Sequence, residues 1–417
     1  MPTRLAALGA LVTALVCSVV AAAPAGASDP GVTSKTITIG FISDLTGPAS
    51  STFFDAAGGI DARVALQNAK GGVDGRKIKV VVKDDATNPA TYFAAASDLA
   101  GSGVFGVVST SSVGFGGSKI LQQAGIPVTG WGFDGPEWGM QPYTNMFSFY
   151  PVTATAFNGN YYTYDYWGRF LKSIGVTKLA GLSYSISPSS QHAIDTTLAS
   201  AGKHGVSTCY NDKTVQFGGV DFTAAALSMK AAGCNGVTVA LVDSSDVAVA
   251  QAVKNAGMKA KTIIGGTGYD NTVLSTPSAA AALDGQYMDT QVDFTPPNTP
   301  TQAMLNALRK YDPQYKGGLP DYGTYVAYLG ADLMIKGLQQ AGNNPTRSAF
   351  ISNLHKVTSY NAGGILPGSV SFSLKNFGTV AMLPKTYCNY FVQLKNDKYT
   401  TTNGNKPWCG SLVAGGS

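Results

Sequence analysis

The residues that decide the fold lie near the start of the chain. They read ITIGFI over residues 37–42, FFDAAGGIDARVALQNA over residues 53–69, and IKVVVK over residues 78–83. The first and last segments are short, apolar and rich in β-branched residues, which is typical of strands, whereas the middle segment has a helical length and ends before Gly71-Gly72. Two strands joined by a helix predict a parallel βαβ unit.

The same alternation continues along the chain in two series. The first series adds helices at 89–99 and 117–124 and strands at 104–109 and 126–129. After Pro151 the second series has helices at 154–174, 189–201, 222–232 and 246–256 and strands at 178–183, 206–210, 236–241 and 262–264. The sequence therefore predicts an α/β protein with two doubly wound, Rossmann-like lobes, and ligands bind such sheets at the edge where the strand-to-helix loops gather.

The remaining residues do not start a third domain. A single strand at 287–292 precedes helices at 300–311, 322–341 and 346–356, and the end of the chain is β-rich. A lone strand needs a partner, so we expect the chain to return to the first lobe and later to cross back. The predicted first lobe comprises residues 36–150 and 286–362, and the second comprises 151–285 and 363–417 with a C-terminal disulfide hairpin. Several crossing segments predict a hinge.

The N-terminal residues predict export. Arg4 precedes an apolar stretch from Leu5 to Ala23, and Ala25-Gly26-Ala27 offers small residues for cleavage, so residues 1–27 are predicted to be a signal peptide. A lipid anchor at Cys17 is an alternative, which Val16 disfavours because a lipidation site has a small residue there. We expect an extracytoplasmic protein, secreted or associated with the cell surface and peripheral to the membrane.

Composition limits the classes of function. The 417 residues suffice for two domains with full hydrophobic cores. The formal net charge is only +5, and Lys and Arg are scattered instead of forming a stripe, which argues against a nucleic-acid partner.

Four cysteines follow the signal peptide, and four cysteines allow three pairings. Cys388 and Cys409 flank an apparent hairpin formed by residues 390–394 and 399–400, so we expect these two to form a disulfide bond. A second bond, Cys209–Cys234, follows by elimination.

The sequence contains no recognisable catalytic or metal motif. Its three histidines, His192, His204 and His355, do not have the spacing of a zinc site, and the chain has neither a nucleophile elbow nor a Walker loop. The segment Gly101-Ser102-Gly103-Val104-Phe105-Gly106 fits a dinucleotide motif, but it ends a helix and enters a strand, which is the reverse of the required order. We therefore expect no enzymatic activity, no cofactor and no metal.

Polar and aromatic residues follow the predicted strands of both lobes. In the first lobe, Ser111 and Ser112 offer hydroxyls and helix-start N–H groups, and residues 131–138 hold three aromatic rings in a glycine-rich loop. The second lobe contributes loops after three of its strands. The predicted ligand-binding residues are Ser111, Ser112, Trp131, Gly132, Phe133, Asp134, Tyr184, Asp243, Thr267 and Asp270.

Several segments together resemble the type I periplasmic solute-binding proteins of ABC importers, in the branch of the leucine/isoleucine/valine-binding proteins. These segments are residues 39–48 (IGFISDLTGP), 68–78 (NAKGGVDGRKI) with Asp84-Asp85, 124–127 (AGIP), 221–223 (DFT) and 227–233 (LSMKAAG). The resemblance spans nearly the whole chain after the signal peptide. It implies two lobes that close on a small molecule.

The resemblance also implies roles for individual residues. Ser111 would contact a ligand carboxylate, helped by Gly132, Phe133 and Asp134. An aromatic residue common in the family would fall near 187–189, where this chain has Pro188, and the acidic residue that receives an ammonium group would fall near Thr267. An amino-acid site would therefore need Asp134, Asp243 or Asp270 to receive the ammonium group.

The sequence thus predicts the solute-binding component of an ABC importer, a monomer that traps a carboxylate-bearing solute and delivers it to a permease with its ATPase subunits. The solute is a branched-chain or other amino acid, or an aromatic or apolar acid. Two alternatives stay open. One is a secreted sensor that presents its closed form to a receptor, and the other is a hydrolase that uses the serine-rich loop as nucleophile.

Overall fold

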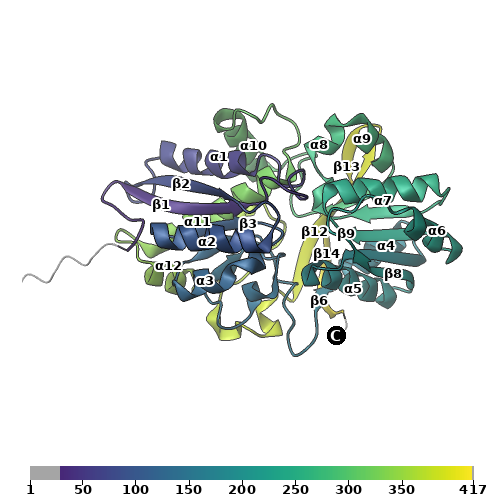
Figure 1. The fold of residues 1–417 in the computed structure, drawn as a ribbon, viewed down its shortest axis with the longest axis horizontal. Coiled ribbons are helices and arrows are strands. Elements are labelled where there is room, and N and C mark those ends of the chain that lie inside the picture. The colour runs from purple at the N-terminus through teal and green to yellow at the C-terminus, as the bar shows by residue number, and fades with distance from the viewer. Residues whose placement is uncertain (1–28, 416–417) are drawn as a thin grey trace, which may run out of the picture.

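The computed structural model describes residues 29–415 and consists of two α/β lobes side by side (Figure 1). The predicted signal peptide, residues 1–27, and Cys17 lie outside the described residues. Among the residues described, no helix has the length and apolar character needed to cross a bilayer.

The first lobe is built on a five-stranded parallel sheet with the order β2-β1-β3-β4-β5. Its strands are β1 (Thr36–Ser43), β2 (Lys77–Asp84), β3 (Val107–Thr110), β4 (Val128–Gly130) and β5 (Met146–Ser148). Strand β1 lies between β2 and β3, and the side chains of Ile37, Ile39 and Phe41 are fully buried, because helices cover both faces of the sheet. The opening βαβ prediction is therefore confirmed, with β1 and β2 paired in parallel.

Six helices surround this sheet. They are α1 (Ala56–Ala69), α2 (Pro89–Ser102), α3 (Ser118–Gln123), α10 (Thr299–Tyr311), α11 (Tyr322–Ala341) and α12 (Arg347–Leu354). Helix α1 starts three residues later than predicted, and Asp55 before it has a left-handed φ of 53°. Helices α1 and α11 pack closely: a Cβ built on Gly59 would lie only 1.9 Å from the carbonyl oxygen of Thr324.

The second lobe contains a nine-stranded mixed sheet with the order β6-β14-β12-β11-β10-β9-β7-β8, in which β13 pairs with β12. The strands are β6 (Tyr162–Tyr164), β7 (Lys178–Tyr184), β8 (Ser207–Val215), β9 (Gly236–Ala240), β10 (Lys261–Ile264), β11 (Tyr287–Thr290), β12 (Thr386–Lys395), β13 (Lys398–Thr401) and β14 (Trp408–Ala414). Its helices are α4 (Tyr166–Ser173), α5 (Pro188–Lys203), α6 (Thr223–Ala231), α7 (Asp243–Asn255), α8 (Asn271–Ser275) and α9 (Pro277–Leu283). Both lobes together confirm the predicted α/β fold class.

One helical prediction for the second lobe is wrong, and two short helices of this lobe were missed. The helix predicted over 154–174 is instead strand β6 followed by the shorter helix α4. Asn158 and Gly159 have φ values of 52° and 75°, in the left-handed region, and they form a turn in which Phe157 pairs with Asn160. Helices α8 and α9 were not predicted.

The lone strand and the segment after residue 362 also lie elsewhere than expected. Strand β11 pairs in parallel with β10, so it belongs to the second sheet and not to the first lobe. Conversely, Phe372 packs 5.5 Å from Phe147 of β5, and Leu383 joins the core of the first lobe. The chain therefore recrosses just before β12, because the apolar residues of 365–383 cover an exposed edge of the first lobe.

Three segments connect the lobes, between β5 and β6, between β11 and α10, and just before β12. Both predicted disulfide bonds are present. Cys388 and Cys409 are directly opposite each other on β12 and β14, so this bond staples two antiparallel strands. Cys209 on β8 is bonded to Cys234, just before β9.

Candidate ligand-binding cleft

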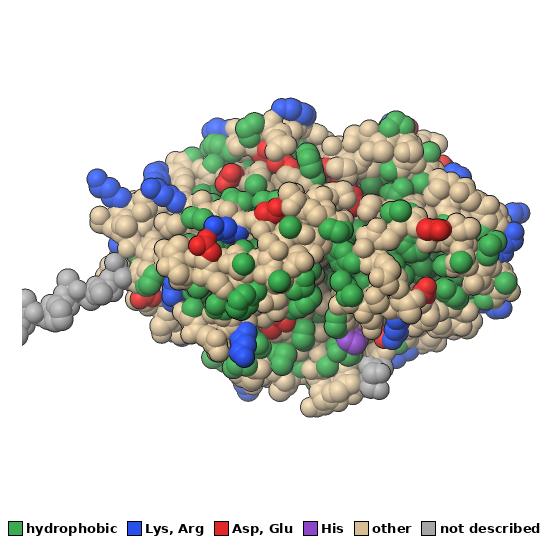
Figure 2. Space-filling view, in the orientation of Figure 1, with side chains coloured by type: hydrophobic (Ala, Val, Ile, Leu, Met, Phe, Trp, Pro, Cys, Tyr) green, Lys and Arg blue, Asp and Glu red, His purple; other side chains and the backbone are tan. Residues whose placement is uncertain are grey.

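A cavity of about 170 Å³ lies between the lobes and is lined by residues of both. One water needs only roughly 10–15 Å³ on such a scale, so the cavity is large enough for a small organic molecule. Figure 2 shows hydrophobic side chains along the seam between the two halves of the face in view, with Lys and Arg side chains lying away from it.

The first-lobe wall of the cavity is aromatic. Trp131 and Phe133 stack with ring centroids 5.3 Å apart, and Phe133 lies 5.4 Å from Tyr150. Phe53 and Tyr322 each meet Trp131 edge to face, at 6.1 and 5.8 Å. The rings follow the ends of β1, β4 and β5 and the start of α11, where the sheet edge and helix α11 meet the cleft. Such contacts hold the rings in place before any ligand arrives.

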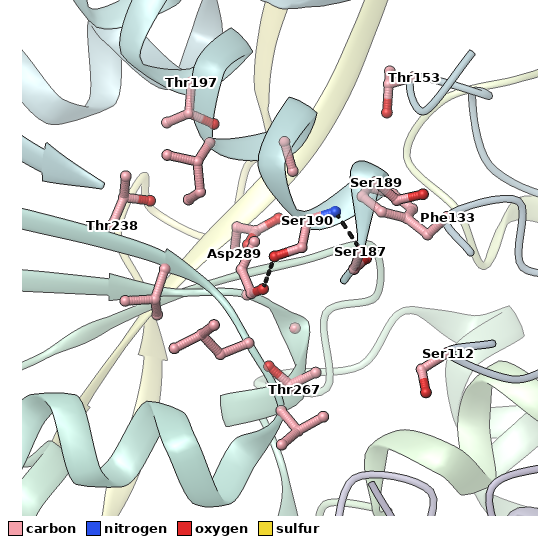
Figure 3. A pocket seen from close by; sticks show the side chains of 18 of the residues that line it. Ser112, Phe133, Thr153, Ser187, Ser189, Ser190, Thr197, Thr238, Thr267 and Asp289 are labelled. Carbon is pink, nitrogen blue, oxygen red and sulfur yellow. Dashed lines mark hydrogen bonds between the residues drawn. The ribbon is translucent and has the colours of Figure 1, made fainter. Parts of the chain in front are cut away.

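The second-lobe wall combines aromatic rings with hydroxyl groups. Its rings are Tyr164, Tyr166, Trp167, Tyr184 and Phe217, and its hydroxyls include those of Thr163, Ser187, Ser189, Ser190, Thr238 and Thr267. Figure 3 shows Ser190, Thr267 and Asp289 from this lobe, and Ser112, Phe133 and Thr153 from the other. Ser187 caps helix α5 by accepting from the Ser190 N–H, which brings the start of α5 to the cavity.

Six of the residues expected to bind ligand line this cavity. They are Ser112, Trp131, Phe133, Asp134, Tyr184 and Thr267. The hydroxyl of Tyr184 donates to Ser245 at 3.0 Å and accepts from the Val242 N–H, so its ring is held in a fixed orientation. The Asp134 carboxylate accepts from the indole N–H of Trp138.

The other four residues lie outside the lining. The Ser111 hydroxyl is buried and accepts from the Val113 N–H, and the Gly132 N–H donates to Ser148. Asp243 instead contacts the opposite lobe: it accepts from the hydroxyls of Ser51 and Thr52 at 2.6 and 2.9 Å.

Asp270 also joins the lobes. Its Oδ2 accepts from the Tyr322 N–H at 2.5 Å, while its Oδ1 caps helix α8. Asp243 and Asp270 thus connect the lobes at the cleft and do not face its interior.

The acidic groups around the cleft are deeply buried. Burial raises the pKa of Asp44 to about 8, with help from the charge of Asp85, and raises the pKa of Glu137 and of Asp289 to about 7. Burial likewise raises the pKa of Asp134 and Asp246 well above the usual range. Within residues 29–415 none of these five forms a salt bridge, and no Lys, Arg or His lines the cavity.

Two lining residues, Asp289 within β11 and Gln291 directly after it, were not expected from the sequence. The signal was present, because polar residues at the end of a strand mark the ligand edge of a parallel sheet. The strand itself was expected in the first lobe. Tyr150, Tyr166 and Tyr322 were missed as well, because they come from crossing segments or helix starts.

The sequence and the fold both match known solute-binding proteins. The chain is 25% identical over 321 residues to the Leu/Ile/Val-binding protein homolog 3 of Brucella melitensis, covering 76% of this chain and 83% of that protein. It is 26% identical to homolog 2 of Brucella abortus, over 75% and 81% of the two chains.

Solved structures with a similar fold share little sequence identity. A fatty acid ABC transporter substrate-binding protein from Thermomonospora curvata superposes with a TM-score of 0.72 at 18% identity, over 93% of both chains. A solute-binding protein from R. palustris in complex with benzoate gives 0.71 at 17% identity, over 91% and 97%. LivJ of Streptococcus pneumoniae in complex with isoleucine gives 0.68 at 19% identity, over 91% and 100%.

The signature of the periplasmic binding proteins matches residues 36–398, which include the first lobe, all three crossings and the second lobe up to the start of β13. These are solute-binding proteins and not enzymes. The two-lobed fold, the aromatic cavity between the lobes and the match over most of the sequence agree, and the chain belongs to the periplasmic binding protein family.

Proposed function

We propose that this protein is the extracytoplasmic solute-binding component of an ABC importer and captures a small, largely apolar solute by closure of its lobes. The observation that carries the proposal is the cavity lined from both lobes. A ligand in it would touch both lobes at once, so binding would favour the closed arrangement over the open one.

The contacts at the mouth of the cleft support closure. Asp243 and Asp270 of the second lobe accept hydrogen bonds from Ser51, Thr52 and Tyr322 of the first. These bonds require the lobes to be together, and bending of the three crossing segments would break them. The closed form would then be the form that the permease and its ATPase subunits receive, with the binding protein acting as a monomer.

The sequence predicts a carboxylate-bearing solute, and among such solutes an amino acid fits the cleft best. An ammonium group would find carboxyl groups at Asp289 and Asp134. An aromatic or fatty acid would bring an anion into a cavity whose described lining has no cationic side chain. The aromatic walls suit an apolar side chain such as that of leucine or phenylalanine.

The hydrolase alternative has little support. Ser112 donates to the Asp44 carboxylate, whereas a nucleophile would need a base such as histidine. Among the described residues, His192 stacks on Tyr161, His204 lies near Asp165, and His355 contacts the carbonyls of Phe372 and Thr144, so no histidine reaches the cavity. A secreted sensor would use the same closure and differs only in its partner.

The test is to denature the purified protein and to identify any released small molecule by mass spectrometry. A refolded sample is then screened by thermal shift against amino acids, amines and organic acids. We expect at least one solute to raise the melting temperature by several degrees, since ligand at 100 times its Kd adds about 2.7 kcal/mol to stability. If nothing is released and no solute of the panel raises the melting temperature, the proposed function is wrong.

A further inference from the structure

Two hydroxyl groups that line the cleft donate to buried acids. Ser112 donates its hydroxyl proton to Oδ1 of Asp44 at 2.8 Å, and the Ser112 N–H donates to Oδ2 at 2.7 Å. Thr267 donates its hydroxyl proton to Oδ2 of Asp246 at 2.7 Å. A hydroxyl has one proton and two lone pairs, so each of these groups keeps lone pairs for a ligand donor while its own proton is directed to the acid. The N–H of Ser112 is engaged with Asp44 and is therefore not free to receive a ligand carboxylate.

Two further lining residues offer acceptors. Gln291 is only 4% exposed, and its Oε1 has no hydrogen-bond partner in the part of the chain that the structure describes. Asp289 is 8% exposed and accepts from Asn389 through Oδ2. The Oδ1 of Asp289 and the hydroxyl oxygen of Thr267 both lie beside Gly265: a Cβ built on that glycine would be 3.9 Å from the first and 3.5 Å from the second. An unpaired buried acceptor such as the Gln291 Oε1 is costly, and a ligand N–H group would satisfy it.

Aromatic rings surround the same acidic group. The rings of Tyr150, Tyr166 and Tyr322 line the same cavity as Asp289. Burial raises the pKa of each of these tyrosines, and the charge of Asp289 adds to the shift. The negative faces of aromatic rings attract organic cations, most strongly where water is excluded. A carboxylate in the same place would be repelled by Asp289 and would have no cationic side chain of the described lining to offset its desolvation.

We propose that the cleft selects an organic cation: a protonated amine on an apolar body, held by Asp289, Gln291 and Thr267 among aromatic rings, with no carboxylate required. This inference rests on the proposed function and specifies the charge of the solute. It differs from the carboxylate expected from the sequence, because the N–H and the hydroxyl of Ser112 are both hydrogen-bonded to the buried Asp44.

The test compares ligands that share an apolar body and differ only in their charged groups. One set is leucine, 3-methylbutylamine and 4-methylpentanoate, and the other is phenylalanine, 2-phenylethylamine and 3-phenylpropanoate. Each is titrated by isothermal calorimetry at pH 7.5 into protein that has been unfolded, dialysed and refolded. We expect the amine of at least one set to bind at least tenfold more tightly than the matched acid, with the amino acid between them.

A matched pair of variants locates the charge recognition. Asp289→Asn removes the acidic group from the cleft, and Asp284→Asn removes an exposed carboxylate of the same lobe that lies outside the cavity lining. We expect Asp289→Asn to weaken amine binding tenfold or more and to narrow the gap between amine and acid, while Asp284→Asn matches the parent chain. If Asp289→Asn does not fold, Gln291→Leu serves as the second variant and is expected to weaken the amine in the same way.

The outcomes separate this inference from the proposed function. If acids bind and the matched amines do not, the cation preference is wrong while solute capture stands. If no ligand of either set binds, the molecule released from the purified protein decides: an anion without a cationic group overturns the inference, and an amine supports it. If nothing binds and nothing is released, both proposals fail.

Discussion

The hydrogen bonds of Asp243 across the cleft lead to the most direct prediction about closure. Replacing Asp243 by alanine removes the acceptor for the hydroxyls of Ser51 and Thr52, at 2.6 and 2.9 Å, from the opposite lobe. Hydrogen bonds to charged groups contribute about 1.5–3 kcal/mol each, and we take the low end because Ser51 is partly exposed. The two bonds together then favour the closed form by about 3 kcal/mol, so Asp243→Ala should lower the closed-to-open ratio about 150-fold.

Asp221→Ala is the matched control. Both aspartates accept a nearby backbone N–H, from Ser244 and Thr223 respectively, so both variants lose a similar local contact. Asp221 is exposed and makes no hydrogen bond to the first lobe within the described chain. The difference between the variants therefore reports the bonds between the lobes.

The assay is single-molecule energy transfer between dyes on Lys79→Cys and Lys203→Cys, two exposed positions in different lobes. We expect the Asp243→Ala protein to spend more time open than the control, and its affinity for the tightest ligand of the calorimetric sets to fall by tenfold or more. Equal distance distributions and equal affinities in the two variants would refute the role of Asp243 as a contact that stabilises closure.

Three further predictions concern stability. Burial raises the pKa of Asp289 to about 7, so the folded state binds the Asp289 proton more tightly than the unfolded state does. The stabilisation that comes from this proton is fully present below about pH 4 and is lost as the pH rises to about 7. The free energy of unfolding of the parent chain should therefore fall between pH 4 and pH 8, and in Asp289→Asn this fall should be smaller by roughly 2–4 kcal/mol, measured by urea unfolding. An equal fall in both proteins would contradict this prediction. Removing the Cys388–Cys409 bond, which closes a loop of sequence separation 21, should cost about 3 kcal/mol in the same assay, and a loss below about 1 kcal/mol would count against it. Gly59→Ala should lower the melting temperature strongly, because its Cβ would meet the Thr324 carbonyl, whereas Gly101→Ala in helix α2 meets open space and should raise stability by about 0.5–1 kcal/mol. Equal melting temperatures for these two variants would show that helices α1 and α11 can move apart at little cost.

The sequence by itself determined the local elements and their class. Strand β1, helix α11 and the alternation in both lobes were predictable because side-chain periodicity and glycine positions act within a few residues. The pairing of Cys388 with Cys409 was predictable for a similar reason, since a nearby hairpin brings them together. The loops after the parallel strands were correctly expected at one edge, and six of the ten predicted residues line the cavity.

The tertiary structure alone decided what depends on partners distant in sequence. Strand β11 pairs with β10 in the second sheet, and the local sequence pattern of β11 does not determine which strand it pairs with. The Ser112 hydroxyl is oriented by Asp44, 68 residues away, and Asp243 meets Ser51 from another lobe, so the roles of these side chains follow from packing. The charge of the cleft likewise depends on which carboxyl groups are buried there without a cationic side chain of the described chain beside them. Residues distant in sequence bury these groups, so the local sequence does not reveal it.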